Sequence, residues 1–105
     1  MKYALLVLAT IAAAGAAHAK DLNLAVRTAQ AVSPNNSEND AIAFCNAGEV
    51  ATGGGVQLGT GGVAGAYITS TKPYVSNGKV IGWEAIVTNQ SGADLPTTWY
   101  AVCQH

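Results

Sequence analysis

Charged and chemically reactive side chains are scarce in this sequence. Of its 105 residues, only 5 are Lys or Arg, 6 are Asp or Glu, 2 are cysteine and 2 are histidine. No basic patch and no basic amphipathic segment stands out that would bind a phosphate backbone or an anionic membrane surface. We therefore expect neither a nucleic-acid partner nor a membrane-surface partner.

The groups that usually carry catalysis are also few. Beyond residue 19 the one histidine is the last residue, His105, so a Ser-His-Asp or Cys-His arrangement lacks an internal base. Glu49 and Glu84 fall on ordered-looking segments, and a catalytic carboxylate pair would need both in one cleft. We expect instead two solvated carboxylates on outward faces. The sequence predicts no catalytic residue and a non-enzymatic protein.

The sequence does not match known metal-binding or phosphate-binding motifs at their essential positions. Oxygen-bearing side chains alternate over residues 36–40 as in calcium loops, but Ala41 and Ala47 stand where an EF-hand has glycine and glutamate. Gly54 stands where a P-loop needs its lysine. We expect no metal site and no cofactor, and an ordinary polar loop over residues 33–40.

The chain begins with the pattern of an export signal. Lys2 precedes an apolar run over residues 4–14, and Ala17-His18-Ala19 fits the small-residue cleavage site. The apolar run is too short to span a bilayer, which makes a signal anchor the weaker alternative. We expect cleavage near Ala19, giving a signal peptide over 1–19 and a secreted or periplasmic β-domain over 20–105. No membrane insertion is expected after cleavage.

Cys45 and Cys103 are the only cysteines, and export would deliver them to an oxidising compartment. An intramolecular disulfide is the natural pairing, with an intermolecular bond as the alternative. The bridge would close a loop of about 58 residues, and the chain-entropy model assigns such a loop about 4 kcal/mol of stability.

Short β-favouring runs separated by turn residues predict an all-β fold. The expected strands cover 22–32, 41–46, 50–58, the two arms around Asn77-Gly78, and 97–104. About six strands in so short a chain predict a compact antiparallel β-sandwich or small barrel.

Asn77-Gly78 between two β-rich runs is typical of a type I′ hairpin. A two-residue turn there would pair Val75 with Val80, Tyr74 with Ile81 and Lys72 with Trp83. Pro73 within the first arm favours an edge strand, because proline cannot donate to a ladder.

Three consecutive glycines at residues 53–55 lie between apolar residues, and no helix follows to make a phosphate-binding turn. Glycine inside a strand marks a bulge or the close approach of another group. We interpret these glycines as structural, crowded by Trp83 or Trp99. Trp99 shares the face of Cys103, so we expect it to be buried near the bridge.

Four segments together follow one pattern: residues 26–29, 45–55, 82–84 and 100–103. The pattern, C-x-A-G-x-V-A-T-G-G-G, then G-W, then Y-A-V-C, resembles a small disulfide-linked β-domain found in many secreted bacterial proteins, largely uncharacterised. It is also similar to modules appended to collagen-like or tail-fibre-like chains. The resemblance implies a fold and a compartment rather than an activity.

Two sets of residues are candidates for function. Leu22, Leu24 and Val26 precede the disulfide loop and form a candidate assembly strand, because a terminal strand can pair with a neighbour's edge. Trp83, Tyr74 and Lys72 form a candidate ligand site, in which Trp83 is half exposed with a cation–π contact from Lys72. Intramolecular pairing of the strand and core packing of the tryptophan are the respective alternatives.

The sequence therefore favours a secreted or envelope-associated interaction or structural domain, serving adhesion, an appendage or the cell surface. Its partner would be a protein or a glycan at the cell surface, or a further copy of the chain. A glycan-binding module and a small secreted inhibitor are the alternatives.

Overall fold

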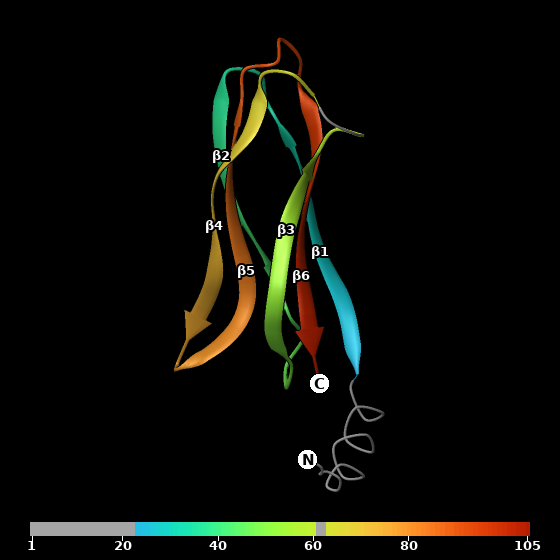
Figure 1. Cartoon of the computed structure of the whole chain (residues 1–105), viewed down its shortest axis with the longest axis vertical. Helices are drawn as coiled ribbons and strands as arrows, with labels where there is room; N and C mark the ends of the chain where they lie inside the picture. The colour runs from blue at the N-terminus through green and yellow to red at the C-terminus, as the bar shows by residue number, and fades with distance from the viewer. Residues whose placement is uncertain (1–22, 61–62) are drawn as a thin grey trace, which may run out of the picture.

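The computed structural model describes residues 23–60 and 63–105. The expected signal peptide and Leu22 therefore lie outside the described residues. Within these residues six strands follow one another: β1 (Leu24–Ser33), β2 (Ser37–Phe44), β3 (Val50–Leu58), β4 (Ala66–Ser76), β5 (Lys79–Asn89) and β6 (Leu95–Gln104) (Figure 1).

The strands form two three-stranded antiparallel sheets, with the orders β1-β6-β3 and β2-β5-β4. The all-β prediction is confirmed, and of its two forms the sandwich is the observed one. The central strands β5 and β6 alternate most regularly between buried and half-exposed residues, because each packs one face against the other sheet.

The polar loop predicted over 33–40 is wrong in its second half. The turn is confined to residues 34–36, where Asn36 takes a φ of 60°, and β2 begins at Ser37. Glu38 and Asp40 face solvent on this strand, which explains why its sequence looks like a loop. β6 likewise begins at Leu95 rather than 97, whereas β3 has the predicted bounds.

The hairpin at Asn77-Gly78 is present, but its register is only partly as predicted. Both turn residues have positive φ, 50° and 75°, as a type I′ turn requires. Val75 pairs with Val80 as expected. Beyond this pair Ile81 is an extra residue on β5, and its carbonyl accepts a hydrogen bond from the Cys45 N–H at 2.8 Å.

This bulge shifts the pairs from Tyr74 to Ser70 by one residue. Tyr74 lies opposite Gly82 and Lys72 opposite Glu84, so the predicted pairs Tyr74–Ile81 and Lys72–Trp83 are wrong. A second bulge between Ile68 and Ser70 restores the register set by the turn, so that Ile68 lies opposite Val87. Since side chains alternate between faces, each shift changes which residues share a face.

The core between the sheets is narrow and is filled by one large side chain among small ones. Trp99 is 1% exposed and donates its indole N–H to the Ala85 carbonyl at 2.9 Å. Around it are buried alanines of both sheets, with Val87 and the disulfide sulfur of Cys103. The expected burial of Trp99 on the face of Cys103 is confirmed.

The triple glycine is needed at its middle position. A Cβ on Gly54 would lie 2.3 Å from Trp83 Cγ and 2.4 Å from the Tyr100 carbonyl oxygen, whereas Gly53 and Gly55 have nothing within 4 Å. The structural interpretation is therefore confirmed, and the crowding side chain is Trp83. Any side chain at position 54 would therefore collide with the Trp83 ring of the facing sheet, and only glycine fits there.

Candidate interaction site at the edge of strand β1

Strand β1 is paired on one side only. It lies at the edge of its sheet and is hydrogen-bonded to β6 over its full ten residues. Its outward side chains include Leu24, Val26 and Val32, which are 61%, 59% and 59% exposed. The candidate assembly residues Leu24 and Val26 thus lie together on the outer face of a free edge.

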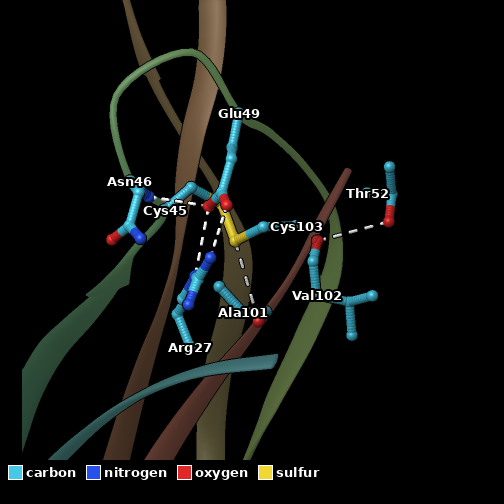
Figure 2. The surroundings of a disulfide bond; sticks show 8 residues. All are labelled: Arg27, Cys45, Asn46, Glu49, Thr52, Ala101, Val102 and Cys103. Atoms are coloured by element: carbon cyan, nitrogen blue, oxygen red, sulfur yellow. Dashed lines mark hydrogen bonds and ion pairs between the residues drawn. A yellow bond between two sulfur atoms is a disulfide. The ribbon is translucent and has the colours of Figure 1, made fainter. Parts of the chain in front are cut away.

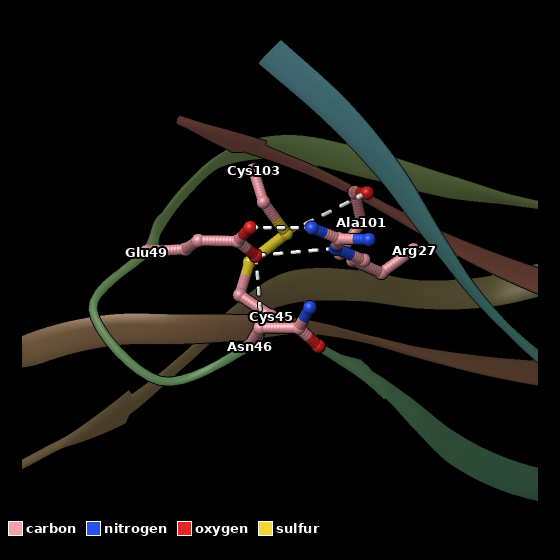
Figure 3. Close-up of polar contacts among 6 residues, drawn as sticks. All are labelled: Arg27, Cys45, Asn46, Glu49, Ala101 and Cys103. Atoms are coloured by element: carbon pink, nitrogen blue, oxygen red, sulfur yellow. Dashed lines mark hydrogen bonds and ion pairs between the residues drawn. A yellow bond between two sulfur atoms is a disulfide. The ribbon is translucent and has the colours of Figure 1, made fainter. Parts of the chain in front are cut away.

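The one charged residue of β1, Arg27, points the other way, toward the inner face. Its Nη2 lies 2.5 Å from Glu49 Oε2 and its Nε donates to Glu49 Oε1 at 3.2 Å (Figure 3). The hydrogen bonds between the two side chains raise the pKa of Arg27 and lower the pKa of Glu49. The outer face of β1 is consequently without charge.

Glu49 sits beside the predicted disulfide. Cys45 and Cys103 are bonded, with their Cα atoms 5.7 Å apart, and the Asn46 N–H donates to Glu49 Oε1 at 2.8 Å (Figure 2). The intramolecular disulfide is confirmed. Glu49 is only 8% exposed, so the expectation of a solvated carboxylate is wrong for this residue. Because both sulfurs are bonded to each other, they are not free thiolate ligands despite lying close to Glu49.

The other three edges carry features that discourage strand pairing. β2 presents the exposed Glu38 and Asp40, and β3 has a bulge at Thr52 beside its glycines. β4 contains Pro73 and the exposed Lys72 and has a bulge at Thr69. Bulges, prolines and outward charges are how sheets block edge-to-edge association. Within residues 23–60 and 63–105, β1 is the edge without any of them.

A shallow hollow of about 320 Å³ follows the second half of β1. Its lining comes from two neighbouring strands: Gln30, Ala31 and Val32 of β1 with Pro96, Thr97 and Thr98 of β6. The free edge thus combines protruding apolar side chains in its first half with a concave surface in its second half.

The candidate ligand residues are not brought together as a group. Trp83 packs against the core and donates its indole N–H to Thr71 Oγ1 at 2.8 Å. Lys72 pairs instead with Glu84, Nζ to Oε1 at 3.7 Å, on the opposite face of β5. The predicted packing of Lys72 against Trp83 is therefore wrong.

Tyr74 has a partner that the sequence alone did not reveal. The rings of Tyr74 and Phe44 meet edge to face, with centroids 5.5 Å apart. Both residues lie opposite Gly82 of the central strand, one from each side. Phe44 remains 51% exposed. Gly82 is the sequence feature that could have predicted this ring pair, because a residue without a side chain leaves room for two rings to meet across β5.

Glu84 lies on the same outer face as this aromatic pair. A hydrogen bond with Asp40 raises the pKa of Glu84, burial adds to the rise, and the Lys72 ammonium partly opposes it. The Glu84 side chain is 14% exposed, so it is also less solvated than expected. Glu84 points away from the core on the sheet β2-β5-β4, whereas Glu49 belongs to the other sheet and points inward. The two carboxylates therefore do not face a common cleft.

Comparison with known proteins gives no relative: no family model, no curated protein and no solved structure matches the chain. Among the described residues, no helix has the length and apolar character needed to cross a membrane. The functional inference therefore depends on the geometry of the strands themselves.

Proposed function

We propose that this protein is a non-enzymatic, secreted or envelope-associated interaction domain that serves a structural role at the cell surface and associates through the free edge of β1. One observation carries the proposal: β1 is a regular ten-residue edge strand with exposed Leu24 and Val26 and without outward charge. Such an edge offers a row of backbone donors and acceptors to another strand.

The disulfide supports the assigned compartment. A bridge such as Cys45–Cys103 persists in oxidising surroundings and is compatible with an extracytoplasmic location. The sequence pattern through Cys45, Trp83 and Cys103, which resembles secreted bacterial β-domains, points the same way. A role in adhesion, an appendage or a surface structure requires a durable fold and an interaction surface; the disulfide supports the first and the free edge of β1 supports the second.

Light scattering of the exported, oxidised protein over a concentration series tests the proposal. We expect the mass to rise above the monomer mass, and Val26→Lys to weaken association at least about fivefold, because an edge lysine must be desolvated on pairing. Val75→Lys is the matched control: Val75 is 56% exposed on the protected edge β4. A monomer at all concentrations, or equal effects of the two variants, would contradict the proposal.

A glycan-binding module is the second candidate, favoured by the exposed Phe44 ring held against Tyr74 beside the Lys72–Glu84 pair. Exposed aromatic faces stack on sugars, and neighbouring charged groups bind hydroxyls. A glycan array probed with wild type and Phe44→Ala tests it. Binding that Phe44→Ala removes and Val26→Lys leaves intact would favour this function, whereas an array without signal would remove it.

A further inference from the structure

We infer that the partner of β1 is β1 of a second copy, paired antiparallel about a two-fold axis that passes beside Thr28. The inference rests on the proposed function, because it identifies the strand that occupies the free edge. Two-fold association brings the same surface of each copy together, so the surface must be complementary to itself.

The faces of the strand restrict the possible registers. Outward side chains of β1 are the even-numbered ones, among them Leu24, Val26 and Val32, while Ala25, Arg27 and Ala29 are half-buried toward the core. Residues opposite each other in an antiparallel pair point to the same face. A continuous sheet with both cores on one side therefore requires even-numbered residues to face even-numbered ones.

Among such registers, the one centred on Thr28 matches the surface best. It places Leu24 opposite Val32 and Val26 opposite Gln30, and it covers the exposed apolar residues at both ends of the strand. Centring on Arg27 would set two arginines against each other. Centring on Ala29 would carry Leu24 past the end of the partner strand, which stops at Ser33.

The hollow beside Val32 adds shape complementarity to this register. Leu24 of the second copy would lie next to Val32, at the rim of the hollow of about 320 Å³ that Val32 and Pro96 help to line. The two-fold axis repeats the contact, so each copy contributes one protruding leucine and one hollow. When the leucine side chain enters the hollow, both the leucine and the apolar residues at the rim lose contact with water.

The association would also close at two copies. The joined sheet would have the order β3-β6-β1-β1-β6-β3, and its outer edges would be the bulged, glycine-bearing β3 strands. The bulge in each β3 strand disfavours pairing with a further strand. Because one strand pair buries less than a standard interface of about 1,600 Å², we expect a dissociation constant in the micromolar range or weaker.

The test uses opposite charges at the residue that faces itself. Thr28→Lys and Thr28→Glu should each weaken the dimer about fivefold, because like charges would then lie directly opposite. An equimolar mixture of the two variants should restore association to about the wild-type strength, through a heterodimer that pairs lysine with glutamate. Sedimentation equilibrium of the exported, oxidised proteins measures all three samples.

Gln30→Lys and Gln30→Glu are the matched controls. Gln30 is also exposed on the outer face, but in this register it faces Val26, so mixing the two variants should not restore association. An association that Val26→Lys removes but that grows beyond a dimer, or shows rescue at position 30 or none at 28, would overturn the two-fold register alone. A wild type that stays monomeric would overturn the register and the proposed function together.

Discussion

The two ends of the sandwich are held together by different chemistry. At one end the Cys45–Cys103 bridge lies beside the Arg27–Glu49 ion pair. At the other end no charge takes part in the buried contacts around Asn89, which is 0% exposed. The Asn89 amide N–H groups donate to the Ser33 and Ala93 carbonyls, and its carbonyl oxygen accepts from the Ser91 N–H and hydroxyl.

Strand β1 is attached at both of these ends, and the comparison explains how its edge stays free. Arg27 fixes the strand to Glu49 near the disulfide, and Ser33 fixes it to Asn89 and, through its hydroxyl, to Thr97 at 2.8 Å. Both attachments use inward groups. The side chains of the outer face take no part in these attachments, so its apolar residues are available to contact a partner.

Removing the disulfide should have the largest effect, because it takes away the covalent link at one end of the sandwich. We expect the double variant Cys45→Ala with Cys103→Ala to lose about 4 kcal/mol of unfolding free energy, because the unfolded chain regains the entropy of a closed loop. Urea denaturation of the oxidised wild type and the variant measures the difference. A loss below about 1 kcal/mol would show that the Arg27–Glu49 contact and the ladders hold this end without the bridge.

Asn89→Ala should have the next largest effect and tests the uncharged end. Four hydrogen-bonding groups would lose a partner, among them the Ser33 carbonyl in a buried contact, and we expect a loss of about 2 kcal/mol. Asn35→Ala is the control, since Asn35 caps the same end through the Gly92 N–H in an exposed contact and should cost about 0.5 kcal/mol.

The double-cysteine and Asn89 changes can also be combined. Distant sites without shared partners add in free energy, so the combined variant should lose the sum of the two effects. Coupling of more than about 0.5 kcal/mol would mean that the two ends communicate through β1 and that they are not the separate attachments inferred from the structure.

Much of the fold could be predicted because its signals are local. Asn77-Gly78 specifies a turn by backbone conformation alone, and two cysteines have only one possible intramolecular pairing. The register beyond Val75 could not be predicted, since the Ile81 bulge accompanies a hydrogen bond to Cys45, which is distant in the sequence. Alternation cannot detect an extra residue on one strand.

The candidate site, like the fold, could be predicted from the sequence only in part. Alternation over Leu24 and Val26 was enough to propose an assembly strand. What alternation does not give is a partner. Glu49, which directly precedes β3, is buried where it pairs with Arg27 of β1, the other edge strand of the same sheet. A buried carboxylate and a solvated one cannot be told apart in the sequence.

Acid should weaken the charged end alone, and we expect this to be the smallest effect, since Arg27 is partly exposed. The pKa of Glu49 is lowered in the folded state, so its contribution is present above the ordinary pKa of 4.5 and is lost as the pH falls from there through the lowered value. The raised pKa of Glu84 acts with the opposite sign, because the folded state then binds its proton more readily.

Thermal unfolding of wild type and Glu49→Gln at pH 7 and pH 3 isolates the contribution of Glu49. Glu49→Gln should be less stable than wild type at pH 7, and the difference in stability should narrow at pH 3. The Asn89→Ala deficit should stay constant, because no titrating group takes part in the hydrogen bonds of Asn89. A gap for Glu49→Gln that is equally wide at both pH values would show that the glutamate stabilises through its hydrogen bonds irrespective of charge.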